Sequence, residues 1–443
     1  MRAASRLARK ASVRSLQRGL SSQPAHDYIV VGSGPAGAAL ARKLGENCPD
    51  SKILVLEAGK KRDWYPWFHI PVGYLYTIDN PKADWLFRTA PEPGLNGRSL
   101  LYPRGLGLGG CTLINGMIYM RGQADDYEEW AQLLEDPNWS WKSVLEMMKE
   151  QEDYYGQSSE LHSTGGPWTV QKIRSDWEIL RAWVDAAENF GIPRTTDFNT
   201  GNNHGVGFFD VNQKKNGLRL SSVDAFLGKD RPSNVHVRAG SVVDKLILSD
   251  DSTSCCGITL AGGEKLMAKK EVILSAGAIG SVQILERSGV GKGDILEKAG
   301  LSVAKELPGV GENLQDHLQL RLVFGVENVA TLNTQANSVI GQAKIGLQYI
   351  TTGTGPMASA PSQLGAFVKS SDAEIRPNLQ YHIQPLSLPA FGQNLDSFDA
   401  FTVSVCDLRP TSRGSVHISS KGKRNSPQFF DSIFYGSLTI FML

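Results

Sequence analysis

Cysteine and histidine are scarce in this chain of 443 residues, and neither shows a spacing that binds metals. The eight histidines contain no His-x-x-x-His or His-Glu-x-x-His pattern, so a catalytic metal has little support. The five cysteines include one adjacent pair but no Cys-x-x-Cys. That pattern indicates neither a disulfide framework nor a zinc site, and it fits a reducing compartment. They are Cys48, Cys111, Cys255, Cys256 and Cys406.

Long apolar runs are also missing. No run reaches the roughly 18 residues that suggest a membrane span, which favours a soluble or peripheral protein. The chain is 41% hydrophobic and 21% charged. This is an ordinary globular composition, in a chain long enough for two domains or one interleaved pair.

Acidic residues are absent from the first 26 positions, which contain six basic residues among serines and alanines. This composition is typical of a transit peptide. We interpret residues 1–26 as a mitochondrial transit peptide, with a disordered basic tail or a plastid signal as alternatives. Removing the segment leaves a net negative chain, so no nucleic acid partner is expected.

A strand, a glycine-rich turn and a helix open the remaining sequence. The apolar run 28–31 predicts a strand, an Ala/Leu-rich helix follows to Leu44, and a second strand covers 53–56 and ends at Glu57. This order is typical of a dinucleotide site: the turn lies against a pyrophosphate and the terminal acid binds ribose hydroxyls. An acid there suits NAD and FAD alike. The turn consists of Gly32, Ser33, Gly34, Pro35, Ala36 and Gly37.

A second glycine-rich stretch occupies 103–122 and runs into an apolar segment. Because glycine lets a main chain approach where a side chain would clash, it indicates backbone packed against a ligand. Together with the first turn, it suggests one extended cofactor held at both ends.

This stretch resembles the first signature of the glucose-methanol-choline oxidoreductases. A second signature of that family matches 277–291, and the resemblance runs from about Asp27 to about Pro427. Leu106, Cys111 and Val282 depart from the usual residues. The matching positions in the first signature are Gly109, Gly110, Thr112, Ile114, Asn115 and Tyr119.

The resemblance implies FAD as the cofactor. It places Glu57 at the adenosine ribose, the backbone of Val243, in a strand matching 235–248, at the adenine, and the second glycine-rich stretch at the pyrophosphate and flavin ring. We interpret Cys111 as a small residue beside the cofactor, with a redox thiol as the alternative. The implied contacts in that stretch are Gly107, Gly109, Gly110, Cys111, Asn115, Gly116, Met117 and Ile118.

The same resemblance implies oxidation of the CH–OH group of a small alcohol, choline-like or another primary alcohol, with hydride transfer to flavin N5. Oxygen and a membrane quinone both stay open as the electron acceptor. Choline-type relatives often carry a glutamate where this chain has Gln363. We interpret His317 as structural. His382 and His417 lie in alternating, strand-like runs at 379–383 and 414–419, so we interpret them as side chains packed on sheet faces.

No catalytic residue is assigned, because the catalytic histidine of the family is expected beyond the end of this chain. Residues 429–443 depart from the expected continuation, which suggests a truncated product. A terminal strand or a membrane-surface anchor is the alternative for that tail, so a peripheral membrane contact stays open. The alternative function is a non-catalytic FAD-binding fragment or isoform.

The expected fold is α/β: a doubly wound, Rossmann-like FAD domain interleaved with a substrate domain on an antiparallel sheet. The FAD domain is predicted to take 27–155 and 205–320. The substrate domain is predicted to take 156–204 and 321–428, leaving 429–443 as a divergent tail.

Overall fold

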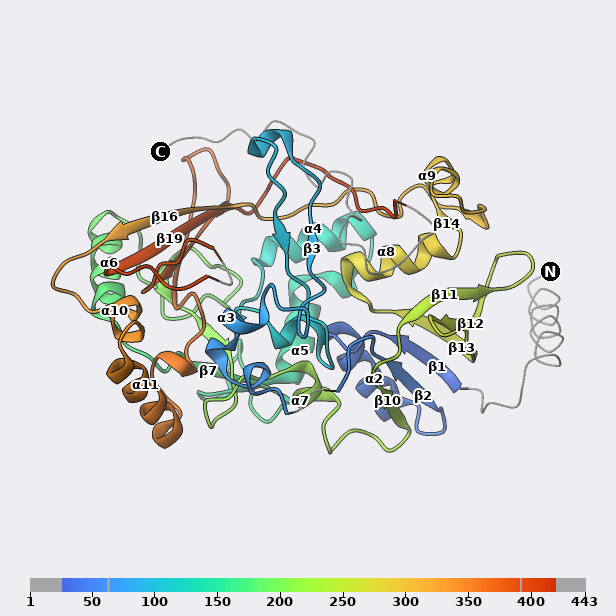
Figure 1. Cartoon of the computed structure of the whole chain (residues 1–443), viewed down its shortest axis with the longest axis horizontal. Coiled ribbons are helices and arrows are strands. Elements are labelled where there is room, and N and C mark those ends of the chain that lie inside the picture. The colour runs from blue at the N-terminus through green and yellow to red at the C-terminus, as the bar shows by residue number, and fades with distance from the viewer. Residues whose placement is uncertain (1–25, 62–63, 391–392, 420–443) are drawn as a thin grey trace.

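Two sheet-based regions lie side by side along the long axis of the molecule (Figure 1). The computed structural model describes residues 26–61, 64–390 and 393–419. The predictions for the transit peptide up to residue 25 and for the tail at 429–443 therefore fall outside the described residues.

The first region is a six-stranded sheet with the order β10-β2-β1-β13-β12-β11. Its first four strands run parallel, and β12 and β11 extend it by antiparallel pairing. The single strand expected over 235–248 is wrong, because the chain breaks after Arg238 and its two halves join opposite edges of the sheet. The strands are β1 (His26–Val31), β2 (Ile53–Leu56), β10 (Val235–Arg238), β11 (Val243–Leu248), β12 (Cys255–Leu260) and β13 (Lys265–Leu274).

Helices cover both faces of this sheet, which confirms the doubly wound prediction. Alternate residues of a strand point to opposite faces, and Val30 accordingly packs toward α2 (Pro35–Asn47) and α7 (Ser222–Phe226). Its neighbour Ile29 shares a core on the other face with Ile284 of α8 (Gly277–Arg287).

The second region is a fully antiparallel sheet with the order β16-β19-β18-β17-β8. Its apolar face packs against α6 (Glu178–Asn189), where Leu180 and Val184 meet Leu364 and Ile383. The predicted antiparallel substrate sheet is therefore present. The strands are β8 (Gly205–Phe208), β16 (Gln319–Gly325), β17 (Leu364–Val368), β18 (Leu379–Gln384) and β19 (Ala400–Asp407).

One strand, β8, lies in the antiparallel sheet, although the predicted division of the chain assigns its residues to the FAD domain. The interval 205–320 was expected on the FAD side, yet β8 pairs with β17 in the antiparallel sheet. A four-residue Gly-Val-Gly-Phe strand has no local feature that selects its sheet, because its partner lies about 160 residues away in sequence. The predicted domain limits otherwise stay predictions.

A small four-stranded sheet, β5-β9-β7-β6, lies between these regions, with two helices close to it. No helix among the described residues is long and apolar enough to span a bilayer. The remaining elements are α3 (Tyr74–Thr77), β3 (Phe87–Arg88), β4 (Leu101–Tyr102), β5 (Ile118–Tyr119), α4 (Ala124–Leu134), α5 (Trp141–Gln151), β6 (Glu152–Tyr154), β7 (Trp168–Lys172), β9 (Asp210–Asn212), β14 (Val290–Gly291), α9 (Gly293–Lys298), β15 (Lys305–Glu306), α10 (Leu332–Ala336) and α11 (Val339–Thr352).

Candidate functional site

The first glycine-rich turn links β1 to α2 and leaves the helix N-terminus open. A Cβ on Gly32 would lie 2.3 Å from the carbonyl oxygen of Ser275, and one on Gly37 would lie 2.1 Å from the carbonyl oxygen of Gly32. By contrast, a Cβ on Gly34 meets nothing within 4 Å. Gly34 is the N-cap residue of α2 and makes no side-chain cap, and Pro35 follows it. The first-turn amides, including those of Ala36 and Gly37, have no acceptor within the helix, which is the arrangement that binds phosphate.

Glu57 follows β2 and is buried beside this turn. Its carboxylate accepts hydrogen bonds from Ser33 N at 3.1 Å, Ser33 Oγ at 2.7 Å and Gly59 N at 2.7 Å. Burial raises the pKa of Glu57, and these hydrogen bonds oppose that rise. The amides of Ser33, Ala58 and Gly59 and the Ser33 hydroxyl all act on this carboxylate, which fixes its position at the end of β2.

The second glycine-rich loop lies directly on the first. Gly109 N donates to Ser33 Oγ at 3.1 Å, and a Cβ on Gly110 would lie 3.0 Å from the Cα of Gly34. Gly110 has a φ of +54°, a conformation that favours glycine. Gly107 is buried next to Gly59, and Cys111 is partly exposed in the turn that follows.

Beyond this turn, residues 115–118 run along the substrate side. Asn115 is exposed, and its Oδ1 accepts from Met117 N at 3.2 Å. A Cβ on Gly116 would lie 3.3 Å from Cγ of Pro361, so the loop touches the segment that leads into β17. The Met117 side chain is buried, its backbone N and O bond Asn115 Oδ1 and Asn212 N, and Ile118 begins β5.

Arg219 holds this loop in place, and sequence reasoning did not identify it as a site residue. It is fully buried and donates to Asn115 Oδ1 at 2.7 Å, Asn115 O at 2.8 Å, Thr112 O at 3.3 Å and Pro71 O at 3.2 Å. Burial lowers its pKa to about 9, which still leaves it charged at neutral pH. The only signal in the sequence was that this arginine stands between two leucines. A charged side chain in such an apolar setting is rarely buried unless it has a partner.

Val243 opens β11, and its side chain is buried in the sheet core. The segment just before it runs along the residues after β2, with Ser241 N bonded to Glu57 O at 2.8 Å and Gly240 N to Gly59 O at 2.9 Å. The backbone near Val243 is therefore beside the predicted ribose site.

The residues present fit FAD. An open helix N-terminus suits a pyrophosphate, a buried carboxylate at the end of β2 suits a ribose hydroxyl, and two contacting glycine loops leave backbone surface without side chains. Residues 115–118, which contact the segment leading into β17, would hold the flavin ring.

A polar sheet face looks toward this loop. The pairing places Arg321, Ser404, His382 and Gly365 in one row across the sheet. Burial, and then the charge of His317, lower the pKa of His382 to about 4, so it is neutral at pH 7. On the opposite face the next row is apolar: Leu322, Val403, Ile383 and Leu364.

The other two histidines singled out in the sequence lie outside this row of residues. His317 is exposed and lines a cavity of about 190 Å³ with Asp316 and Leu408. His417 was expected in a strand, but it follows an isolated bridge and its Nδ1 lies 2.6 Å from Glu286 Oε1. The alternating pattern at 414–419 was therefore misleading, because no partner strand lies beside it among the described residues.

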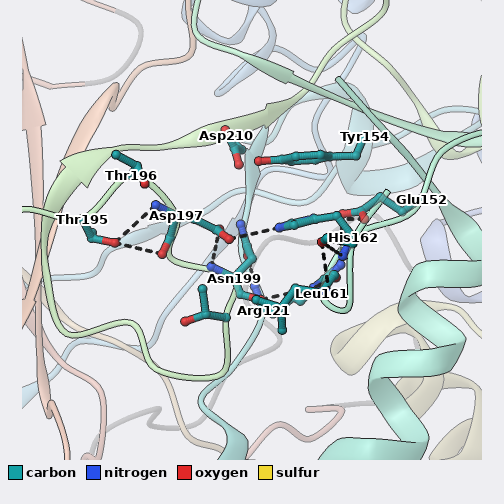
Figure 2. Close-up of polar contacts among 12 residues, drawn as sticks. Arg121, Glu152, Tyr154, Leu161, His162, Thr195, Thr196, Asp197, Asn199 and Asp210 are labelled. Atoms are coloured by element: carbon teal, nitrogen blue, oxygen red, sulfur yellow. Dashed lines mark hydrogen bonds and ion pairs between the residues drawn. The ribbon is translucent and has the colours of Figure 1, made fainter. Parts of the chain in front are cut away.

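Figure 2 shows a buried charged cluster at the far end of β5. His162 lies between two carboxylates, with Nδ1 3.1 Å from Glu152 and Nε2 3.0 Å from Asp197. Arg121 bonds Glu152 Oε1 at 3.0 Å and donates to the carbonyls of Leu161 and Asn199. The cluster ties the strand that leaves the cofactor loop to two other loops.

Comparisons with known proteins agree with this geometry. Residues 26–319 match the GMC oxidoreductase family. The chain is 35% identical over 409 residues to the oxygen-dependent choline dehydrogenase of Pectobacterium atrosepticum, covering 91% of this chain and 72% of that protein. It is 36% identical over 409 residues to the alcohol dehydrogenase (acceptor) of Pseudomonas putida, covering 91% and 73%.

Among solved structures, pyridoxine 4-oxidase from Mesorbium loti superposes with a TM-score of 0.79 at 26% identity. The superposition covers 93% of this chain and 76% of that one. The chain therefore belongs to the GMC oxidoreductase family, as both signatures and the contact between the two glycine loops indicate.

Proposed function

We propose that this chain is an FAD-dependent oxidoreductase that holds FAD between its two glycine-rich loops and acts on the CH–OH group of a small alcohol. The observation that carries the proposal is the contact of the Gly34 and Gly110 loops beside the buried carboxylate of Glu57. Family membership and the similar alcohol dehydrogenases support the reaction class.

Different residues bind different parts of the cofactor. The amides after Gly34 bind the pyrophosphate, Glu57 accepts from the ribose, and the backbone at Val243 meets the adenine. The stretch from Gly107 to Ile118 lies along the pyrophosphate and the flavin ring. When bound, FAD supplies the hydride acceptor that alcohol oxidation requires.

The alcohol lies between the cofactor loop and the polar sheet face. There the hydroxyl of a substrate meets amide and hydroxyl groups that can orient it. His382 is a neutral imidazole on this face, so it can accept a hydrogen bond from the alcohol, although its lowered pKa makes it a weak base.

Gly34→Ala tests the cofactor assignment. The backbone φ of Gly34 is −62°, which alanine adopts, and its Cβ meets no protein atom within 4 Å. The variant should therefore keep its thermal stability while its FAD dissociation constant rises about tenfold or more, roughly 1.4 kcal/mol. Gly94→Ala is the matched control, since its Cβ also meets nothing. Equal FAD affinity in both variants would contradict the assignment.

The electron acceptor and the cellular site are part of the proposal. We infer molecular oxygen or a quinone as the acceptor, and the name of the Pectobacterium relative favours oxygen. Stopped-flow reoxidation of the reduced protein, with air or with a soluble quinone, separates the two by rate. A quinone would require peripheral contact with a membrane.

We further propose a mitochondrial destination, supported by the six basic residues and the lack of acids in residues 1–26. Fusion of this segment to a fluorescent reporter tests it. Mitochondrial fluorescence supports the proposal, and diffuse or plastid fluorescence contradicts it.

A further inference from the structure

Helix α11 turns its apolar side away from the protein. None of its 14 residues is buried, and Figure 1 shows it at the edge of the molecule beside α10. A helix that packs on a core normally directs its apolar residues inward and its polar residues outward. Four apolar residues of α11 are instead strongly exposed. They are Val339, Ile340, Leu347 and Ile350, with exposed fractions of 83%, 71%, 64% and 83%.

Two contacts fix which side of α11 faces the protein. Ile345 packs against the core of the antiparallel sheet, and Tyr349 donates its hydroxyl to Gly217 O at 3.3 Å. Ile345 and Tyr349 are four positions apart and therefore lie on the same side of the helix. At about 100° per residue, the opposite side is occupied entirely by apolar residues. We call these residues the outer face of α11: Val339, Ile340, Ala343, Leu347 and Ile350.

The helix is closed at both ends, so the outer face is a fixed surface. Ser338 Oγ accepts from Gly341 N at 2.9 Å at the N-terminus. At the C-terminus Gly353 has a φ of +64°, the left-handed conformation that ends many helices. A Cβ on Gly217 would lie 2.3 Å from the carbonyl oxygen of Gly353, so this end rests on the loop around residue 217. The outer face cannot turn inward without breaking these contacts.

The charge carried by this part of the chain is positive. No acidic residue occurs between Glu327 and Asp372, and the basic residues in that interval are Lys344 and Lys369. Lys344 is exposed and lies four positions after Ile340, which places it at the border of the outer face. The outer face is therefore apolar, flanked by a lysine and free of carboxylates from its own helix.

Helix α4 also exposes apolar side chains, but its charge is opposite. Leu133 is 82% exposed and Trp130 is 49% exposed. Four acidic residues share this helix, and an anionic surface would repel them. They are Asp125, Asp126, Glu128 and Glu129. Exposed apolar area thus occurs on both helices, whereas only α11 combines it with a positive charge.

An anionic lipid surface fits the outer face better than a second copy of this chain does. In lipid, the apolar side chains enter the interface while a flanking lysine stays among the headgroups. In a two-fold pairing of α11 with the same helix of a second copy, Lys344 lies near the middle of the helix and would approach its own counterpart. Like charges would then oppose the pairing.

We propose that the outer face of α11 is a docking surface for an anionic membrane. A helix of 14 residues is about 21 Å long, which is short of the roughly 20 residues that a span requires, so α11 lies along the membrane surface. This inference goes beyond the proposed function, because it depends on neither FAD nor an alcohol.

Vesicle binding tests the docking surface. Sedimentation of the full-length chain with vesicles of phosphatidylcholine and phosphatidylglycerol measures its partition coefficient. Ile350→Glu should lower this coefficient by at least about tenfold, because it places a carboxylate in the outer face. Ile375→Glu is the matched control: Ile375 is 90% exposed on a loop beside α4, and this variant should bind as the wild type does. No binding by the wild type, or equal binding by the two variants, would overturn the proposal.

The basic residues at positions 1–26 also attract anionic lipid. They are present in every variant, so the ratio between Ile350→Glu and Ile375→Glu reports on α11 alone.

Lys344→Gln tests the choice of an anionic surface. It should lower the partition coefficient on the anionic vesicles by about fivefold and leave binding to pure phosphatidylcholine vesicles within about twofold. The same loss on both kinds of vesicle would contradict the role of the lysine charge.

Hydrogen exchange of the wild-type chain gives a second readout that does not depend on the folding of a variant. Adding vesicles should slow exchange over 339–352 and leave 124–134, in α4, unchanged. Slowing over both segments, or over neither, would overturn the proposal. A chain that self-associates through Ile350 and does not bind vesicles would assign the outer face to a second copy and overturn it as well. Each of these failures leaves the proposed alcohol oxidation untouched.

Discussion

Single buried charged residues hold the cofactor loops in shape. Glu57 joins the first loop to the second through Ser33, and Arg219 satisfies carbonyls from two segments, at Thr112 and at Pro71. A buried charge is tolerated when hydrogen bonds replace its hydration. Both residues are therefore more sensitive to substitution than their neighbours.

Arg219→Met should lower the free energy of unfolding by on the order of 3 kcal/mol, since it leaves several buried carbonyls without donors. It should also weaken FAD binding, because Asn115 loses its anchor. Urea denaturation and FAD titration measure the two effects. Arg231→Met is the control, as Arg231 bonds only nearby carbonyls. An equal loss in both variants would contradict the role of Arg219.

His162 predicts a pH-dependent contribution to stability. Burial opposes its charged form, but hydrogen bonds to Asp197 and Glu152 prevail and raise its pKa from 6.5 to about 9. A raised pKa stabilises the fold fully below pH 6.5, and that contribution is lost as the pH rises through about 9. The stability gap between wild type and His162→Gln should therefore shrink from pH 6 to pH 9.5 in urea denaturation.

The exposed His204 supplies the control for that experiment. His204→Gln should show a small gap with little change over the same pH range. A gap for His162→Gln that stays constant, or widens, with pH would show that the imidazolium is not the stabilising form.

Sequence patterns located the glycines and Glu57, because each performs a local task that its type reveals. They did not locate Arg219 or the His162 cluster as a unit. Arg219 bonds a residue more than 100 positions away in sequence. The His162 cluster joins residues from separate segments of the chain. Such distant partners leave no local periodicity in the sequence.

At the scale of helices and strands, the local sequence pattern predicted an element's bounds best where characteristic residues marked both of its ends. The strand 53–56 and the helix after Gly34 matched β2 and α2 closely. The stretch 235–248 reads as one strand, but Gly240, with a φ of +67°, turns the chain between two sheet edges. Pairing partners determine which sheet β8 joins and whether the stretch at 414–419 forms a strand. A local pattern does not specify those partners.

Gly365→Ala tests close packing between elements. A Cβ on Gly365 would lie 2.0 Å from the ring of Phe209, so the ring or strand β17 must shift. We expect a loss of about 1 to 3 kcal/mol in the free energy of unfolding. Gly325→Ala, also in a strand of this sheet, meets nothing within 4 Å and should be nearly neutral. Similar stabilities in urea for both variants would contradict the packing argument.

On the scale of the whole molecule, the antiparallel sheet ends in the described structure at an apolar strand. In β16, Leu320 and Leu322 are 53% and 46% exposed, and the strand pairs only with β19 among the described strands. An exposed apolar edge strand promotes association.

Leu322→Lys should weaken self-association of the purified chain by about tenfold, roughly 1.4 kcal/mol, because it places a charge on the edge strand. Sedimentation velocity across a range of concentrations measures the change. Leu133→Lys makes the same substitution on exposed α4 and is the control. A wild-type chain that stays monomeric at all concentrations would contradict the prediction.

The fold class and the cofactor were predictable from the sequence, since two signatures and a βαβ pattern lie in continuous segments. The polar sheet face was not, because its residues come from four strands between 319 and 407 and only their register aligns them. Its composition is a property of the assembled molecule.

The most direct test of the central claim is anaerobic mixing of the FAD-loaded chain with choline and with a panel of small primary alcohols, followed at the absorbance band of oxidised flavin. The account predicts bleaching of that band at a rate that rises and saturates with alcohol concentration. A band that stays unchanged while FAD and the alcohol are both bound would contradict it.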